Sequence, residues 1–226
     1  MIQRTIHYCW FGNAPYNNLI SKCMDSWREM LPEFRLKLWN EDNSPMDHPF
    51  VKKMYKEKKW AFVADYIRLH ALYNEGGIYL DTDMEILKSL NVFSNDKCFL
   101  GFESPEFVAA GIIGSEEKHP FIKQCLDAYD HLQEPVNIPL ILTHILTRNG
   151  LNSYKNQVVG EVSLYECEVF YPWKFRTEFD EKSITENSFA VHHLHYSWKP
   201  GFVDKLKRKI KSFSNVEADS WKSAIE

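Results

Sequence analysis

The stretch GGIYLDTDMEIL, residues 76–87, places Asp81 and Asp83 directly after a run of apolar residues. Side chains on a strand alternate between its two faces, so an extended stretch would present both aspartates on one side, together with Tyr79. Two carboxylates this close repel each other unless a cation, a proton or open solvent relieves them. Because oxygen ligands favour hard ions, the pair predicts a site for Mn²⁺ or Mg²⁺. A solvated turn at a strand end would have the same short pattern.

A second charged pair precedes this stretch. Asp65 and Arg68 are three residues apart in the otherwise apolar segment WAFVADYIRLHALY, so a helix would place them on one face. A buried helix has little reason to carry such a pair unless it forms a structural ion pair or faces a ligand. Gly76 and Gly77 predict a tight turn at the end of this helix, which would bring the charged pair and the two aspartates to one pocket.

The hydrophobic pattern predicts an alternation of strands and helices that would position these residues. The predicted strands cover residues 5–12, 34–40, 78–83, 97–103, 109–115, 162–173 and 188–198. The predicted helices cover residues 17–31, 60–77, 119–132 and 138–150. This order indicates an α/β fold with a mostly parallel, Rossmann-like central sheet flanked by helices. Ligands of such folds bind beyond the carboxyl ends of the strands.

The composition excludes several other classes of protein. A length of 226 residues with 44% hydrophobic content suits one compact unit with a full core. The net charge of −4 gives no overall attraction to nucleic acid. The five cysteines are scattered and include no CxxC pair, which fits neither a disulfide framework nor a zinc site. Because the sequence has no long apolar segment and no signal-peptide pattern, we expect a cytoplasmic protein.

Three segments resemble a known family. ADYIRLHALYNEGGIYLDTDMEIL resembles the signature of glycosyltransferase family 32, and also a segment of the large glucosylating toxins. IQRTIHYCWFGNAP is similar to the opening I-P-K-x-I-H-x-x-W-x-G of that family, with Gln3 and Arg4 in place of the usual proline and lysine. AVHHLHYSW is similar to its closing A-I-H-H-W-x-x-S-W. The three motifs span residues 2–198 in the expected order, and the family implies the GT-A fold of nucleotide-sugar transferases.

The resemblance also implies roles for individual residues. Asp83 would bind a divalent metal directly, and Asp81 would contact the metal or its water and the donor ribose. Asp65 and Arg68 would hydrogen-bond hydroxyls of the donor sugar. The residues expected to complete the donor pocket are Tyr79 and, against the nucleobase, Trp10.

The closing motif would complete the metal and phosphate sites. Its spacing to Ser197 and Trp198 favours His193 as a third metal ligand by analogy with the toxins, while His192 and His195 remain alternatives. Ser197 and the Trp198 indole would donate hydrogen bonds to the β-phosphate.

The implied activity is metal-dependent transfer of a sugar, with retention of configuration, from a UDP- or GDP-sugar to a glycan or lipid-linked acceptor. We expect a role in bacterial surface or capsular polysaccharide synthesis, and we assign no catalytic base. The segment FVAAGIIGSEEKHP resembles the region between the donor and acceptor pockets of the family, but Ala109 and Ala110 stand where polar residues are common.

Two other classes of function remain open from the sequence. A haloacid dehalogenase-like phosphatase also carries D-x-D after an apolar strand, but it usually has threonine or valine where this chain has Glu85. A non-catalytic module that binds a nucleotide or sugar is the second alternative.

Residues 1–200 are expected to form the catalytic domain and residues 201–226 a basic amphipathic helical tail. In this tail, an apolar stripe from Phe202 to Phe213 accompanies five positive charges within residues 205–211. The helix either packs on the catalytic domain or lies on the anionic inner face of a membrane, which would make the protein peripheral. Nucleic-acid binding is disfavoured because no aromatic platform accompanies the charges.

Overall fold

The computed structural model describes residues 1–104, 107–132, 134–172, 180–193 and 222. The strands are β1 (Thr5–Cys9), β2 (Arg35–Trp39), β3 (Gly77–Leu80), β4 (Met84–Ile86), β5 (Cys98–Ser104), β6 (Phe107–Ser115), β7 (Gln157–Val159), β8 (Val162–Tyr165) and β9 (Ala190–His192). The helices are α1 (Asn18–Met30), α2 (Pro49–Lys56), α3 (Trp60–Glu75), α4 (Pro120–His131), α5 (Ile138–Arg148) and α6 (Cys167–Phe170), with 3-10 turns at Leu90–Phe93 and Glu181–Ser183.

Seven strands form the central sheet in the order β2-β1-β3-β6-β5-β8-β7. Strands β2 and β3 pair in parallel with β1, and β8 pairs in parallel with β5. Strand β6 is antiparallel to both β3 and β5, and β7 is antiparallel to β8. Five of the seven strands, all except β6 and β7, therefore run in one direction. The predicted α/β fold with a mostly parallel sheet is confirmed, and the carboxyl ends of these five strands share one edge.

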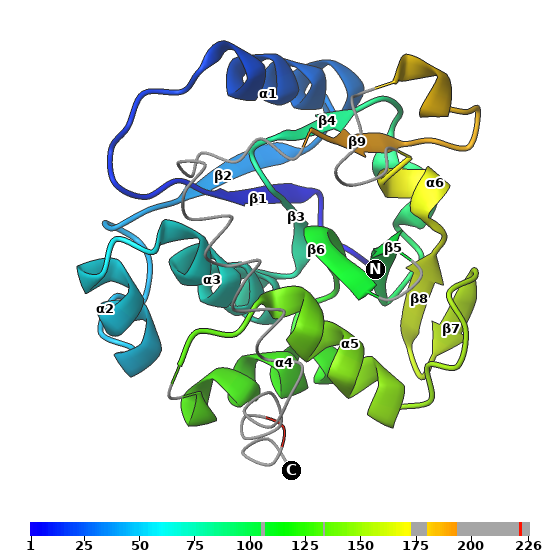
Figure 1. The fold of residues 1–226 in the computed structure, drawn as a ribbon. Helices are drawn as coiled ribbons and strands as arrows, with labels where there is room; N and C mark the ends of the chain where they lie inside the picture. The colour runs from blue at the N-terminus through cyan, green and yellow to red at the C-terminus, as the bar shows by residue number, and fades with distance from the viewer. Residues whose placement is uncertain (105–106, 133, 173–179, 194–221, 223–226) are drawn as a thin grey trace.

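Helices cover both faces of the sheet (Figure 1). Helices α2, α3, α4 and α5 bury their apolar sides in one core, with Tyr79 and Ile113 from the sheet. Helix α1 and the small β4–β9 sheet bury theirs in a second core, with Ile78 and Ile112. Neighbouring strand residues thus enter opposite cores, as the alternation of side chains along a strand requires.

Helix α3 ends at Gly76 and Gly77, where the sequence predicted a tight turn. Gly76 is the C-cap with φ 61°, and its N–H donates to Leu72 O at 2.9 Å. A Cβ at this position would lie 2.8 Å from the backbone nitrogen of Glu117, so the turn needs glycine for space as well as for its conformation. The chain then continues directly into β3, which places the end of β3 beside the buried face of α3.

Three predicted strands differ from the observed ones. Strand β3 ends at Leu80, before the aspartates, and β9 pairs with β4 outside the central sheet. The predicted strand 162–173 stops at Tyr165 and is followed by the helical turn α6. The buried side chains of Val169 and Phe170 are adjacent in sequence, which suits a helical turn better than an alternating strand. Helix α2 was not predicted.

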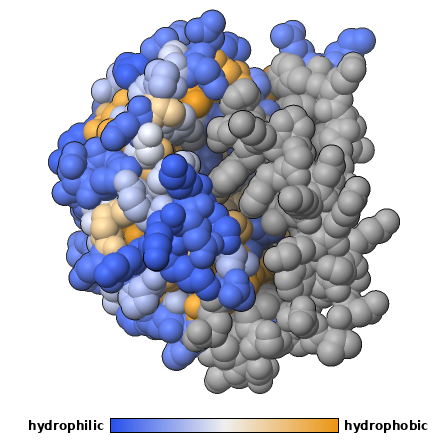
Figure 2. All heavy atoms as spheres, turned by 60° about the vertical axis from the view of Figure 1, so that its left-hand side comes forward, coloured by the Kyte–Doolittle hydropathy of each residue, from blue (hydrophilic) through white to orange (hydrophobic). Residues whose placement is uncertain are grey.

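Several predictions fall outside the described residues. They concern His195, Ser197, Trp198 and the basic amphipathic helix expected in residues 201–226. Among the residues that are described, no helix is both long and apolar enough to cross a bilayer. On the side of the molecule that is on the left in Figure 1, hydrophilic side chains cover most of the described surface and apolar ones form small separate areas (Figure 2).

Candidate functional site

Asp81 and Asp83 lie in a turn at the carboxyl edge of the sheet rather than in a strand. The N–H of Met84 donates to Asp81 O at 3.0 Å, which closes the turn, and the N–H of Asp81 donates to Gly111 O on β6 at 2.8 Å. The turn is anchored from the other side by the Trp27 indole of α1, which donates to Met84 O at 2.7 Å. A bond within the turn and bonds to two other elements, β6 and α1, therefore fix the positions of the two aspartates.

Arg68 links the helix α3 face to this turn. Its Nη2 donates to Asp65 Oδ1 at 2.7 Å, and its Nη1 lies 3.2 Å from Asp81 Oδ1 and donates to Ala110 O at 2.8 Å. The guanidinium lies 4.5 Å from the centre of the Tyr79 ring, whose hydroxyl donates to the same Asp81 Oδ1 at 2.9 Å. The predicted meeting of the charged pair and the first aspartate is observed, with Arg68 as the link.

These groups are buried, and their pKa values reflect it. Burial raises the pKa of Asp65 to about 7, although Arg68 and a hydrogen bond from the backbone N–H of Ile138 oppose the change. Burial by itself lowers the pKa of Arg68, but Asp81 and Asp65 outweigh it and raise that pKa well above its ordinary value. Arg68 therefore stays positive and compensates the charge of the carboxylates that it contacts.

The two aspartates gather with one histidine. The carboxylates of Asp81 and Asp83 and the ring of His192 offer ligand atoms that all lie within 4.8 Å of one another. His192 Nε2 lies 3.1 Å from Asp83 Oδ1, and its buried Nδ1 has no hydrogen-bond partner among the described residues. Burial lowers the pKa of His192, but the charge of Asp83 and its hydrogen bond outweigh burial and raise it.

The neighbouring His193 has a different partner. Its Nε2 lies 2.7 Å from Glu85 Oε2, and Lys22 binds the same carboxylate at 3.0 Å. The sequence favoured His193 for the metal and left His192 open, whereas the structure groups His192 with the aspartates. The pairing of β4 with β9 explains the difference: Glu85 is opposite Val191, so His193, two residues further, lies on the face of Glu85 and His192 on the other.

Trp10 lies just after β1, at the same edge of the sheet. Its indole N–H donates to Ala14 O at 2.7 Å, and its ring packs edge-on against Tyr16 with centroids 4.8 Å apart. The side chain is only partly buried, so one part of the ring remains accessible to a ligand.

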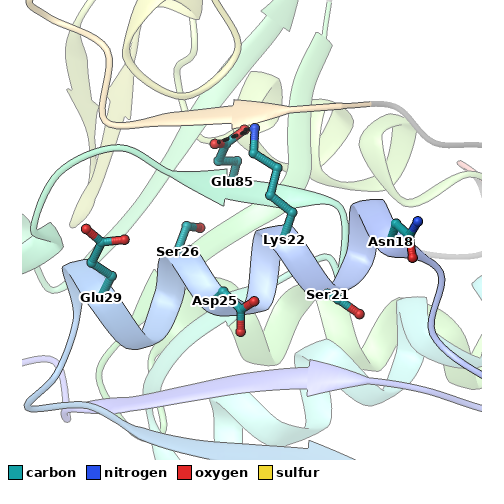
Figure 3. A pocket seen from close by; sticks show the side chains of 7 residues that line it. All are labelled: Asn18, Ser21, Lys22, Asp25, Ser26, Glu29 and Glu85. Atoms are coloured by element: carbon teal, nitrogen blue, oxygen red, sulfur yellow. Dashed lines mark hydrogen bonds and ion pairs between the residues drawn. The ribbon is translucent and has the colours of Figure 1, made fainter.

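A groove of about 470 Å³ runs along the exposed side of α1 (Figure 3). Its lining residues are polar: Asn18, Ser21, Lys22, Asp25, Ser26, Glu29 and Glu85. Glu85 is the residue through which the groove approaches the aspartate turn, and Lys22 reaches across to it (Figure 3). None of the three clustered residues lines this groove, so we distinguish it from the candidate metal site.

Some contacts of the site could not be found from the sequence. The hydrogen bond from Ile138 to Asp65 joins the start of α5 to α3, 73 residues apart in the chain. Tyr171 packs edge-on against His192 with centroids 5.8 Å apart. The one available signal was Gly111 within a predicted strand, since an isolated glycine there often marks close approach by another group.

Comparison with known proteins agrees with this geometry. Residues 17–100 match the family model described as a glycosyltransferase sugar-binding region containing a DXD motif. An uncharacterized glycosyltransferase of Acanthamoeba polyphaga mimivirus is 23% identical over 88% of this chain and 85% of its own length. Inositol phosphoceramide mannosyltransferase 3 of Schizosaccharomyces pombe is 25% identical over 54% of this chain and 36% of its own length. The chain spans between 26% and 44% of the plant, yeast and human relatives that it matches.

Solved structures agree on the fold. The PaToxG glycosyltransferase superposes with a TM-score of 0.52 at 18% identity, over 65% of this chain and 68% of that one. The fold is therefore that of the GT-A type glycosyltransferases. The match of residues 17–100 and the glycosyltransferase relatives support the resemblance of this chain to glycosyltransferase family 32.

Proposed function

We propose that the protein transfers a sugar from a UDP- or GDP-sugar in a reaction that depends on Mn²⁺ or Mg²⁺. The observation that carries this proposal is the cluster of Asp81, Asp83 and His192, at the edge of the sheet where such folds bind ligands. Its two aspartates lie inside the region that matches the DXD-containing family model.

The residues of the cluster fit a divalent ion. The Tyr79 hydroxyl and Arg68 both contact Oδ1 of the Asp81 carboxylate, which leaves Oδ2 without a partner in the described part of the chain. His192 contributes a ring nitrogen to the cluster, and its Nε2 lies 3.1 Å from Asp83 Oδ1. Carboxylate and imidazole ligands are compatible with Mn²⁺ and, with more water retained, with Mg²⁺. We therefore assign His192, in preference to His193, as the third ligand.

The donor sugar is proposed to bind against Asp65 and Arg68. Both side chains are buried and paired with each other, which holds them in one orientation. Their other donor and acceptor atoms therefore point in fixed directions toward a bound sugar. Tyr79 supports that surface through its ring and through its bond to Asp81. Trp10 is proposed to border the nucleobase, and Ser197 and Trp198 to bind the β-phosphate.

The chemistry requires the bond between the sugar carbon and the phosphate oxygen to lengthen, with negative charge growing on the diphosphate. A bound divalent ion would neutralise that charge as a Lewis acid. Asp81 and Asp83 would hold the diphosphate end by way of the ion, while Asp65 and Arg68 would hold the sugar in place as the bond breaks. The family resemblance supports retention of configuration, and we assign no protein base.

The acceptor is proposed to be a glycan or a lipid-linked sugar. One relative is, by its name, an inositol phosphoceramide mannosyltransferase, which supports a lipid-linked acceptor. A role in bacterial surface polysaccharide synthesis, and attachment to a membrane surface through residues 201–226, remain part of this proposal.

The test is release of UDP or GDP from a panel of UDP- and GDP-sugars by the purified chain, with Mn²⁺, with Mg²⁺ and with EDTA. We expect one donor to be cleaved slowly without an acceptor, only when metal is present. Asp65→Ala should abolish this release while leaving the affinity for free UDP or GDP nearly unchanged. Failure of every donor, with no thermal stabilisation by any of them, would contradict the proposal. Phosphate release from a phosphomonoester would favour the phosphatase alternative.

A further inference from the structure

Strands β5 and β6 lose their regular pairing next to the aspartate turn. Their register is continuous from Cys98 to Leu100 and then shifts between Leu100 and Phe102. At this irregularity the backbone N–H of Ile112, on β6, donates to the hydroxyl of Tyr171 at 3.0 Å. Irregularities of this kind often lie beside active sites, where they redirect a group or admit a side chain from outside the sheet.

Two glycines make room for Tyr171. A Cβ on Gly101 would lie 3.2 Å from Cε2 of the tyrosine ring. A Cβ on Gly111 would lie 3.2 Å from the tyrosine hydroxyl and 3.3 Å from Asp81 Oδ2. The hydroxyl and the unpaired oxygen of Asp81 therefore border the same methyl-sized space above Gly111.

The same peptide group connects Tyr171 to Asp81 through the backbone. The peptide between Gly111 and Ile112 accepts from the Asp81 N–H at 2.8 Å through its carbonyl and donates to Tyr171 through its N–H. Tyr171 also packs edge-on against the ring of His192. Tyr171 thus contacts the peptide that binds Asp81, and it contacts the ring of His192 directly.

We infer that Tyr171 is a positioning residue for the proposed metal centre: it fixes the peptide that holds Asp81 and limits the orientation of His192. This inference rests on the proposed metal site. The oxygen of Tyr171 accepts from Ile112, and the hydroxyl borders the same space as Asp81 Oδ2. Partners that orient metal ligands in this way commonly change metal affinity by about 10-fold to 100-fold when they are removed.

The test uses Tyr171→Phe, which keeps the ring and removes only the hydroxyl. Mn²⁺ affinity is measured by electron paramagnetic resonance without any donor, so the result does not depend on activity. We expect the Kd for Mn²⁺ to rise about 10-fold or more. The matched control is Tyr165→Phe: Tyr165 packs on Phe170 with centroids 5.8 Å apart and donates to Asp96 at 2.8 Å, away from the clustered residues. Equal Mn²⁺ affinities for the two variants would overturn the inference.

Gly111→Ala provides an independent test if Tyr171→Phe folds poorly. Its methyl group would crowd both the Tyr171 hydroxyl and Asp81 Oδ2, so Mn²⁺ binding should weaken. Combining the two substitutions removes one of the crowded atoms, and the double variant should lose less affinity than the two single effects together. Fully additive effects would show that the two groups do not share this space.

Asp83→Asn separates this inference from the proposed function. If Asp83→Asn leaves Mn²⁺ binding intact, the metal site itself is wrong. If Asp83→Asn abolishes binding and Tyr171→Phe leaves it intact, only the role of Tyr171 is wrong.

Discussion

A buried histidine, His7, and a partly buried one, His192, have opposite surroundings in this protein. His7, on β1, is completely satisfied: the Trp39 indole donates to its Nδ1 at 3.0 Å, so its Nε2 carries the hydrogen and donates to Gly76 O at 2.8 Å. His192 has Nε2 against Asp83, and its Nδ1 has no hydrogen-bond partner among the described residues. The first histidine therefore closes a structural network, while the second has a ring nitrogen beside a carboxylate of the cluster.

The difference extends to charge. Burial lowers the pKa of His7 to about 4, because no carboxylate contacts its ring. At His192 the charge of Asp83 outweighs the same effect and raises the pKa. A fully bonded neutral histidine fixes the Gly76 turn, whereas a partly bonded histidine among carboxylates is suited to a cation. Burial of a histidine is by itself no guide to its role; the bonding of both ring nitrogens is.

The largest expected effect is at the carboxylate cluster. Asp83→Asn keeps the size of the side chain and removes the charge that would hold an ion, so donor cleavage should fall at least about 1,000-fold, or about 4 kcal/mol. The melting temperature should change little. Asp25→Asn, on the exposed side of α1, is the matched control and should keep full activity. Normal activity of Asp83→Asn, with no loss in EDTA, would contradict the assignment of His192 and the two aspartates to a metal site.

The free energy of unfolding should depend on pH through His7. Below pH 6.5 the unfolded chain takes up a proton at His7 that the folded protein does not accept until about pH 4. The stabilisation is therefore complete above pH 6.5, and the free energy of unfolding should fall by about 3 kcal/mol as the pH drops to 4.

Urea unfolding of wild type and His7→Phe in EDTA measures this slope, which should be shallower in the variant. Nitrogen chemical shifts of the His7 ring provide a second readout in the unmodified protein. If the ring of His7 is protonated at pH 5.5 in the folded protein, the pKa of His7 is not lowered by burial to about 4.

A pair of neighbouring substitutions sharpens the assignment of the metal ligand. His192→Asn should weaken Mn²⁺ binding about 100-fold, or about 2.7 kcal/mol, because it removes a clustered ligand. His193→Asn should change Mn²⁺ binding less than about twofold, since His193 contacts Glu85 instead. Calorimetric titration with Mn²⁺ decides between them, and the reverse order of effects would restore His193 as the ligand.

The smallest expected effect concerns the turn that His7 supports. Gly76→Ala should lower the free energy of unfolding by about 2 kcal/mol, because it combines a positive φ with a close backbone neighbour. Gly160→Ala is the matched control: its φ is 60° but no atom lies within 4 Å of the added Cβ. It should cost only about 1 kcal/mol. Equal losses in thermal or urea unfolding would mean that the packing at Gly76 contributes nothing.

Much of the scaffold followed from local sequence. The apolar run of α3 with the glycine pair after it, the strand stopped at Gly12 and the alternation in β2 each predicted an element that the structure contains. Local sequence was less informative where two structures fit the same pattern. The run after Val162 satisfied both a long strand and a short strand followed by a helical turn, and the packing of Phe170 in the second core decided it.

The sequence by itself identified the candidate residues of the site, because the patterns that indicate them extend over only a few neighbouring positions. The spacing of Asp65 and Arg68 puts them on one side of a helix, and the aspartate pair after an apolar strand predicts a cation site. The family motifs added the class of reaction.

Only the tertiary structure decided which side chains meet. The choice between His192 and His193 depends on the register of a ladder with three pairs, Met84 with His192, Glu85 with Val191 and Ile86 with Ala190. A shift of one residue would exchange the faces of the two histidines, and no local pattern in the sequence specifies that register. The contact of Tyr171 with Ile112 joins positions 59 residues apart. Such contacts arise when separate elements pack together, so the physical information that sets them is spread over the whole chain.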